Sequence, residues 1–455
     1  MKHFPRSVRS LAFALAFVLV AGAASASVTA EEAARLGHDL TPVGAERAGN
    51  PEGTVPPYTG GLTSGPSADA VRKGVRADPF AAEKPLFSID AGNLDRHADK
   101  LSAGTQALLR GQPGFRLDVY PAHRTVAFPK TVLDHTAENA TRAALTAGGL
   151  GMTGARGGIP FPIPANGLEV MQNTHARHAG VAQLMPDNSI YYTDKAGDVV
   201  LSNRSSLLIE FPYYDDRRSA SSPLILRARK EQLFPASAVG QVLLQWEPLS
   251  YADHERRYWQ YLPGQRRVRV VPDVGHDQIN GVTGGIGTVD DVYLFSGKLD
   301  RFRFALVGKR ELYVPYNTYR FAYHEQPEQV FLPKFVNPDL VRWELHRVWV
   351  VEATLKAGAR HLYSRRTFYV DEDSWSILAS DQYDQDGKLS RAGFSYLHQA
   401  WDATAPIVHT FGHYDLLHGV YYVAFWPGKA GVTFPAALQP DASWSPEGLA
   451  ARGVR

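Results

Sequence analysis

The chain has 455 residues, of which 44% are hydrophobic and 11% aromatic, and its formal net charge at pH 7 is +2. This length can bury a sizeable core, and the lack of cysteine excludes disulfides, thiolate metal sites and a thiol nucleophile. The near balance of 48 basic and 46 acidic side chains argues against a general attraction for nucleic acid, so no nucleic acid is expected as a partner.

The N-terminus has the three parts of a cleavable export signal. Lys2, Arg6 and Arg9 are basic, residues 11–21 are an unbroken apolar run, and residues 24–26 (Ala-Ser-Ala) form a small-residue cleavage site. The apolar run is shorter than the roughly 20 residues that a membrane-spanning helix needs. We therefore expect export to the periplasm of a Gram-negative bacterium, with no intrinsic membrane span and, without cysteine, no lipid anchor.

Helical patterns precede strand patterns along the chain. Residues 27–85 are rich in Pro and Gly and predict an extended arm, which opens with a capping box at Thr29 and Glu32. Three helices and one short strand pair are predicted next, the helices at residues 90–110, 131–147 and 167–180 and the strand pair at 115–129.

From about residue 190 the hydrophobic period changes to two, which is the period of a β-strand. Strands are predicted at residues 190–194, 204–211, 224–231, 241–249, 257–262, 266–271 and 302–307, with a last hairpin at 406–414 and 419–426.

Residues 343–394 are the clearest β segment. They hold four runs rich in Val, Thr, Tyr, Trp and Phe, separated by turn sequences at 356–359, 371–374 and 384–387. Gly387 can adopt a positive φ in the last of these turns. The segment predicts an antiparallel meander, and roughly a dozen strands after a few helices predict a mainly β fold of the α+β class.

No motif points to a cofactor. Residues 149–154 match G-x-G-x-x-G, but a predicted helix precedes them and three prolines follow, whereas a nucleotide site needs a strand before and a helix after. His175 and His178 lie three residues apart on a predicted helix without a visible third ligand, so they are interpreted as surface or helix-end histidines. We predict neither a cofactor nor a metal.

Catalytic residues are not predicted either. A G-x-S-x-G nucleophile elbow is absent from the sequence. The acidic pairs Asp215-Asp216 and Asp290-Asp291 and the acidic turn at 371–374 could each act as paired carboxylates. They lie in turns or beside a Gly-rich loop, so they are interpreted as solvated carboxylates.

Aromatic side chains gather on the predicted strands. In a closed sandwich they would form the core, whereas in an open, curved sheet they could line a cavity for an acyl chain or an apolar peptide. The candidates for contact with a hydrophobic ligand are Trp246, Trp259, Tyr261, Trp349, Val351, Phe368 and Trp375. The hairpin at 258–272 places Arg267 and Arg269 on one face and valines on the other, which fits either a plain sheet hairpin or the border of an apolar groove.

Two resemblances follow from these residues. Residues 346–394 resemble the C-terminal half of LolA/LolB-type lipoprotein carriers, in which a strand, an Asp-rich turn, a strand and a YD-x-x-G-K-L hairpin follow one another. Nearly the whole chain is similar to a larger exported family of unknown function labelled outer-membrane lipoprotein-sorting-like. The matching segments are 368–371 (FYVD), 375–378 (WSIL) and 383–389 (YDQDGKL) for the carriers, and 40–46 (LTPVGAE), 78–87 (DPFAAEKPLF), 157–164 (GGIPFPIP), 314–317 (VPYN) and 344–355 (ELHRVWVVEATL) for the larger family.

The resemblance implies a large open antiparallel half-barrel of LolA/LolB type, wrapped over helices around an apolar cavity, with no catalytic residues. The expected regions are a signal peptide at 1–26, an arm with helices and short strands at 27–165, the half-barrel at 166–430 and a C-terminal tail at 431–455.

The implied function is a periplasmic, non-catalytic binding or carrier protein for a lipid, an acylated molecule or a lipoprotein, with an inner- or outer-membrane transport protein as partner. An accessory or structural subunit of an envelope transport complex, with the aromatic sheet as plain core, is the alternative. A hydrolase is a third hypothesis, which lacks a motif.

Overall fold

The computed structural model describes residues 28–67, 69–217, 222–272, 274–436 and 438–452. The export signal predicted at residues 1–26 lies outside them. Within the described part of the chain, no helix has both the length and the apolar character needed to cross a membrane.

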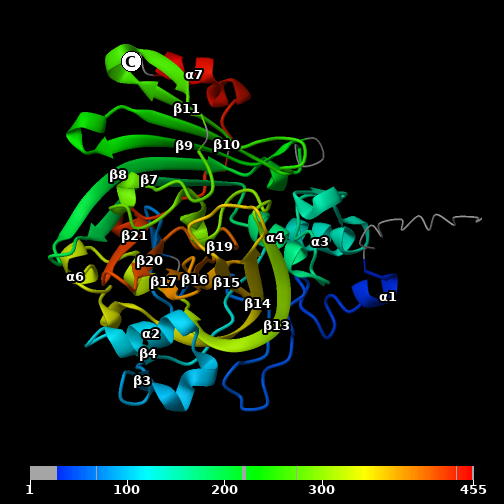
Figure 1. Cartoon of the computed structure of the whole chain (residues 1–455). Helices are drawn as coiled ribbons and strands as arrows, with labels where there is room; N and C mark the ends of the chain where they lie inside the picture. Colours follow the sequence, from blue (N-terminus) through cyan, green and yellow to red (C-terminus); the bar gives the residue numbers. More distant parts are fainter. Residues whose placement is uncertain (1–27, 68, 218–221, 273, 437, 453–455) are drawn as a thin grey trace, which may run out of the picture.

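One 15-stranded sheet dominates the structure (Figure 1). Its first half contains, in spatial order, β12 (Arg267–Val270), β11 (Arg257–Leu262), β10 (Val242–Pro248), β9 (Leu224–Phe234), β8 (Val199–Glu210) and β7 (Ala182–Thr193). Its second half continues with β21 (Val420–Trp426), β20 (Phe411–Asp415), β17 (Leu389–Ser395), β16 (Ile377–Tyr383), β15 (Arg365–Asp371) and β14 (Trp343–Leu355).

Three further strands complete this sheet beside β14: β13 (Phe302–Pro315), β4 (Leu117–Val119) and β3 (Phe87–Ile89). Neighbouring strands are antiparallel, except that β4 meets β14 in parallel between Val119 and Trp343. No pairing between described strands joins β12 to the other end, so the sheet stays open. The predicted fold class, mainly β with a large open antiparallel sheet, is confirmed.

The remaining elements are short. Two-stranded ladders pair β1 (Val71–Arg72) with β2 (Val75–Arg76), β5 (Ala144–Leu145) with β6 (Met152–Thr153), and β18 (His398–Ala400) with β19 (Ala405–Ile407). The α-helices are α1 (Ala30–Ala33), α2 (Ala103–Gly111), α3 (Lys130–Arg142), α4 (Gly167–His175), α5 (Tyr319–Ala322), α6 (Pro327–Val330) and α7 (Pro446–Arg452), and 3-10 segments include η1 (Leu94–Lys100), η6 (Gly281–Thr283) and η7 (Val289–Leu294).

Most local predictions match these bounds. The capping box at Thr29 and Glu32 opens α1, and the strands β14 to β17 form the predicted meander with Gly387 at a φ of 75°. The predicted strand pair at 115–129 is wrong, because β4 pairs with β3, which precedes it by a segment that contains η1 and α2. The helix predicted at 131–147 ends five residues early, since Ala144 and Leu145 leave it to pair with β6.

The acidic turn between β15 and β16 is not solvated as predicted. Asp371, Glu372 and Asp373 are all buried. Arg124 donates hydrogen bonds to both carboxylate oxygens of Asp373 at 2.8 and 2.7 Å, and Arg347 donates to Glu372 at 3.1 Å. Arg124 lies almost 250 positions earlier in the chain, so only the folded structure supplies this cation.

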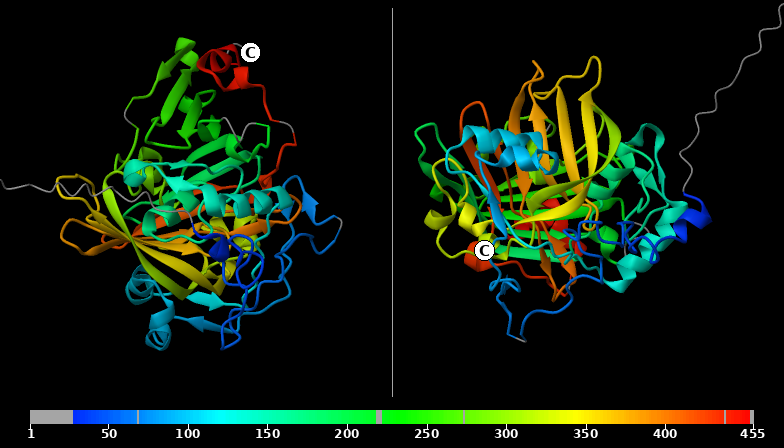
Figure 2. Two further views of the ribbon diagram at one scale, coloured as in Figure 1. Left: turned by 90° about the vertical axis from the view of Figure 1, so that its right-hand side faces the viewer. Right: turned by 90° about the horizontal axis from the view of Figure 1, so that it is seen from below.

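Helices cover both faces of the sheet. Helix α2 packs against β16 and β17, where the backbone N–H groups of Ala103 and Gly104 donate to Asp381 at 3.1 and 2.8 Å. Figure 2 shows this helical region on the side of β13–β17 that faces away from β7–β11. Helix α4 instead contacts β13 and β14 from within the curve of the sheet, and this inner helix borders the cavity described below.

The C-terminal segment closes the outer face of β10 and β11 (Figure 1). Trp444 and Leu449 pack in one buried cluster with Val242, Leu244 and Tyr261. The carbonyl oxygen of Trp444 also accepts a hydrogen bond of 2.9 Å from the indole of Trp246. The predicted tail is therefore part of the packed structure.

We expect Trp444→Ala to lower the free energy of unfolding by about 3–5 kcal/mol, because a fully buried indole leaves a cavity and uncovers β10 and β11. Urea unfolding followed by circular dichroism measures the change. Val239→Ala, at a valine that is 53% exposed, is the control and should shift stability by less than about 0.5 kcal/mol. Equal effects of the two substitutions would contradict the packing described here.

The Asp371 carboxyl predicts a specific pH dependence. Burial, with the nearby Asp373 carboxylate, raises the pKa of Asp371 to about 6 from 3.8. A raised pKa gives stability that is full below the ordinary value and is lost as the pH rises through about 6. Asp371→Asn should therefore flatten the fall in unfolding free energy between about pH 4 and about pH 6, measured by urea titrations across this range. The exposed Asp386→Asn should retain the wild-type slope, and an unchanged slope in Asp371→Asn would refute the prediction.

Candidate functional site

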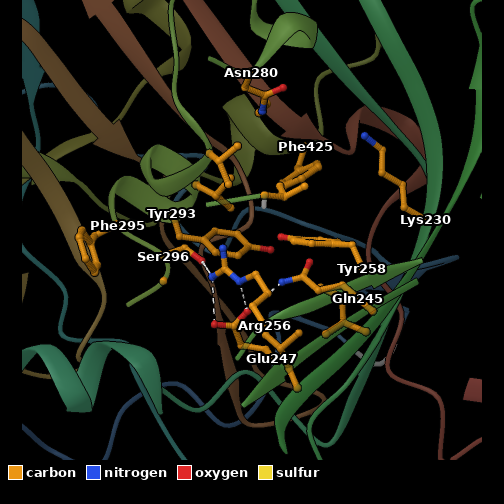
Figure 3. Close-up of a pocket in the computed structure, with 18 of the residues that line it drawn as sticks. Lys230, Gln245, Glu247, Arg256, Tyr258, Asn280, Tyr293, Phe295, Ser296 and Phe425 are labelled. Carbon is orange, nitrogen blue, oxygen red and sulfur yellow. Dashed lines mark hydrogen bonds and ion pairs between the residues drawn. The ribbon is translucent and has the colours of Figure 1, made fainter. Parts of the chain in front are cut away.

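A cavity of about 420 Å³ lies between the strands of the first half of the sheet and the segment 274–299, which follows them in the sequence. One wall comes from β8, β9, β10 and β11, and the opposite wall from α4, β20, β21 and the segment 274–299 (Figure 3).

Strand alternation decides which side chains face the cavity. Because successive side chains of a strand point to opposite faces, every second residue of β9 and β10 lines it. These residues are Leu226, Ala228, Lys230 and Gln232 of β9 and Leu243, Gln245 and Glu247 of β10. Tyr258 and Gln260 continue the same face on β11. The cavity wall is thus apolar at β8 and the first part of β9, and polar side chains are added along the rest of β9, β10 and β11.

The opposite wall is held in place by a buried ion-pair network. Arg366 of β15 is fully buried and donates hydrogen bonds of 2.9 Å to both Asp290 and Asp291 of η7. His361 contacts Asp290 at 2.9 Å, and the Tyr363 hydroxyl donates to Asp291 at 2.8 Å. These bonds fix η7, whose Val289, Val292 and Tyr293 line the cavity.

The interpretation of Asp290 and Asp291 as solvated carboxylates is therefore wrong, since their relative exposures are 3% and 0%. Burial alone would raise the pKa of both carboxyls. The Arg366 charge, together with His361 beside Asp290 and His413 beside Asp291, outweighs burial and lowers both pKa values. Both groups stay ionised, which is the form that holds the network together.

Two aromatic residues that line the cavity have an unusual backbone conformation. Tyr293 has a φ of 56° and Phe425 a φ of 55°, the left-handed region that side chains other than glycine rarely adopt. At Phe425 the register with β7 shifts between Val423 and Trp426, so that both Ala424 and Phe425 face the cavity. The two ring centroids are 6.2 Å apart.

One end of the cavity holds a compact polar group. Arg256 forms an ion pair with Glu247, with one bond at 2.9 Å, and donates to the Ser296 hydroxyl at 2.7 Å. Gln245, seen beside Glu247 in Figure 3, also donates to Glu247, and so does the Tyr251 hydroxyl. Burial would raise the pKa of Glu247, but the charge and hydrogen bonds of Arg256 lower it overall. Glu247 is thus ionised and fully engaged.

The two histidines singled out in the sequence do not form a ligand pair. His175 ends α4 as predicted and lines the cavity, with Nε2 at 2.9 Å from the Pro248 carbonyl oxygen. His178 is buried rather than on the surface, between the rings of Phe128 and Tyr214, and burial lowers its pKa to about 3.

Three side chains of types that can bind a metal ion lie close together outside the cavity. His346, Asp371 and Asp373 each place a donor atom within 4.8 Å of the other two. Asp373 already binds the Arg124 guanidinium through both oxygens, and His346 Nε2 lies 3.0 Å from Glu344. These contacts make the group part of the ionic network under the β15–β16 turn.

None of the seven predicted ligand contacts lines the cavity. Trp246, Trp259 and Tyr261 lie on the opposite face of β10 and β11, beneath Trp444. Their strand neighbours Gln245, Glu247, Tyr258 and Gln260 line the cavity instead. The sequence analysis selected the large aromatic side chains of these strands. The signal that could have indicated the cavity face is the polar or charged residue at every second position of β10 and β11.

The other four predicted residues lie in the second half of the sheet. Val351, Phe368 and Trp375 are fully buried. Trp349 stacks on Trp375 with centroids 6.1 Å apart, and the Lys309 ammonium lies 4.5 Å from its ring. Phe368 comes nearest to the cavity, because its ring centroid is 5.5 Å from that of Phe295, which lines it. Ligand contact by the seven side chains stays a prediction that this geometry does not favour.

Residues 88–450 match the family model DUF1329, a family of proteins of unknown function. The chain belongs to this family. An uncharacterized protein of Pseudomonas aeruginosa is 36% identical over 459 residues, which cover 97% of each chain. The predicted membership of an exported family of unknown function thus agrees with a match over most of the chain.

Several solved structures are similar to part of this chain. A domain from Vibrio parahaemolyticus, named for outer membrane lipoprotein sorting, is 16% identical with a TM-score of 0.41 and covers 62% of this chain and 98% of its own. A DUF1329 family protein from Desulfovibrio piger is 16% identical with a TM-score of 0.39, covering 59% and 92%. A LolA superfamily protein from Nitrosomonas europaea is 12% identical with a TM-score of 0.34, covering 62% and 98%.

Arg366→Met should destabilise the protein by about 3–5 kcal/mol, because it leaves two buried carboxylates without their shared cation. Hydrogen exchange of residues 289–296 should accelerate in the same variant, since η7 loses its anchor to β15. The neighbouring Arg365→Met is the matched control. Arg365 is partly exposed and pairs with Glu352 at 3.1 Å, so its loss should cost less than about 1 kcal/mol. Unchanged exchange at η7 in Arg366→Met would contradict this role.

Proposed function

We propose that this protein is a periplasmic, non-catalytic binding or carrier protein for a hydrophobic ligand in envelope transport. The cavity supports this proposal most directly. Its volume of about 420 Å³ falls within the range of small-molecule sites, and apolar side chains such as Leu207, Ile209 and Leu226 dominate its walls.

Burial without chemistry can account for reversible holding. Each methylene transferred from water contributes about 0.8 kcal/mol, so an apolar chain of about ten carbons gains roughly 8 kcal/mol before the cost of association. Micromolar affinity needs a net binding energy of about 8 kcal/mol, so a chain longer than about ten carbons, or polar contacts in addition, must offset the cost of association as well. Such an affinity allows both capture and release.

The polar groups of the cavity support a non-catalytic role. Ser296 accepts from Arg256, Tyr251 donates to Glu247, and His175 meets a backbone carbonyl group. Nucleophilic catalysis needs a nucleophile beside a free base. Among the described residues that line the cavity, no serine hydroxyl contacts a histidine or carboxylate in this way.

The export signal predicted at residues 1–26 supports the periplasmic location. In the proposed role the protein exchanges its ligand with a transport protein of the inner or outer membrane. An accessory subunit with a solid, ligand-free sheet fits less well. In such a protein there would be no need for a cavity, nor for the buried ion pairs that hold the segment around η7 at its wall.

Filling the cavity should abolish binding of an apolar probe. The wild-type protein should bind the neutral dye N-phenylnaphthylamine with micromolar affinity, and Leu243→Trp should weaken binding at least about tenfold by occupying the space. Fluorescence titration measures both affinities.

The matched control is Leu233→Trp, which makes the same change on β9 at a leucine that is 38% exposed and lies outside the cavity. It should bind the dye as the wild type does. Failure of the folded wild-type protein to bind any apolar probe would refute the proposed function.

A further inference from the structure

Lys230 is a cation placed among apolar side chains. It lies on β9, and Figure 3 shows its ammonium group directed into the cavity. Its cross-strand partners are Leu207 of β8 and Leu243 of β10, both of which also line the cavity. The Phe425 ring lies beside it, with the ring centroid 5.8 Å from Nζ. Among the residues that the structure describes, no carboxylate acts on Lys230, whose pKa is shifted by burial alone.

Arg177 is a second such cation. It follows α4 and lines the same cavity. Its guanidinium donates to the Thr174 carbonyl oxygen at 2.9 Å and lies 4.6 Å from the centre of the Tyr293 ring. Within the described part of the chain it has no acidic partner either.

The two cations stand at neighbouring rings. Arg177 lies over the Tyr293 ring and Lys230 over the Phe425 ring. The centroids of these two rings are 6.2 Å apart. Both rings come from residues with left-handed backbones. Such conformations cost free energy and gather where a site has to be held in a fixed geometry.

The charges of the cavity do not balance. Glu247 is its acidic side chain among the described residues, and Arg256 already neutralises it. Lys230 and Arg177 are therefore left without compensation in an apolar wall. Burial lowers the pKa of Lys230 to about 8 and lowers that of Arg177 from its ordinary value. Both side chains are partly buried. A cation without an acidic partner in an apolar wall adds nothing to the stability of the empty protein, so packing alone does not explain these two residues.

We propose that the cavity binds a single-chain amphiphile with an anionic headgroup, a carboxylate or a phosphate, whose charge lies between Lys230 and Arg177. The inference rests on the proposed function and specifies its ligand class. The apolar chain occupies the space beside Leu207, Ile209 and Leu226, while the headgroup supplies the missing negative charge. A free inorganic anion would leave these apolar walls empty, and an uncharged lipid would leave both cations unpaired.

Three probes with the same chain length test this proposal: dodecanoate, dodecyl phosphate and dodecanol. Each is titrated calorimetrically, the two anions below their micelle concentrations and dodecanol below its solubility limit. The wild-type protein should bind at least one of the two anions roughly tenfold to a hundredfold more tightly than dodecanol, which is the range for hydrogen bonds to charged groups. The preferred anion identifies a fatty-acid or a phospholipid-type headgroup.

Lys230→Met keeps the aliphatic stem and removes the charge. It should lower the affinity for the preferred anion at least about tenfold and leave the affinity for dodecanol within about twofold of the wild type. Lys230→Arg should retain the preference. The control Lys388→Met removes the same charge from an exposed turn outside the cavity and should behave as the wild type. The melting temperature of ligand-free Lys230→Met should equal or exceed that of the wild type, which separates lost binding from lost folding.

Three outcomes would overturn the inference. Equal affinity of the wild type for all three probes refutes it while leaving the proposed function intact, and so does an unchanged anion preference in folded Lys230→Met. Failure to bind any of the three, dodecanol included, refutes the proposed function and this inference with it.

Discussion

The contact on which the site depends most is the buried ion pair between Arg366 and the two carboxylates of Asp290 and Asp291. It joins the second half of the sheet to the segment that forms the far wall of the cavity. Burying three charges is costly, and the surrounding hydrogen bonds from His361 and Tyr363 offset that cost. These ion pairs attach η7 to β15, on the side away from the cavity, and Tyr293 of η7 lines the cavity.

Charge is distributed unevenly around that cavity, and the contrast separates structural from functional polar groups. Glu247 and Arg256 satisfy each other and behave as part of the scaffold. Lys230 and Arg177 face the same space with only aromatic rings and a carbonyl group beside them. Residues that lower the stability of the empty protein are typical of binding sites, where a ligand completes the interaction.

Features that depend on neighbours in sequence could be predicted. The meander at 343–394 follows from its period of two and from turn residues such as Gly387, and the capping box at Thr29 needs only Glu32 three positions later. Pairings between distant segments could not. β4 pairs with β3 and not with the residues after it, because the loop between them folds back through η1 and α2.

The sequence by itself determined a mainly β chain with an antiparallel meander, because strand period and turn chemistry are local. The open sheet was implied by the family resemblance, which covers most of the chain. Tertiary structure decided which face of each strand is inside. Trp246 and Tyr258 have the same local pattern, yet one lies under Trp444 and the other lines the cavity. It also decided which carboxylates are buried, since the arginines that donate hydrogen bonds to Asp291 and Asp373 come from segments distant in sequence. Alternation fixes two faces, but only the packing of distant elements gives each face its environment.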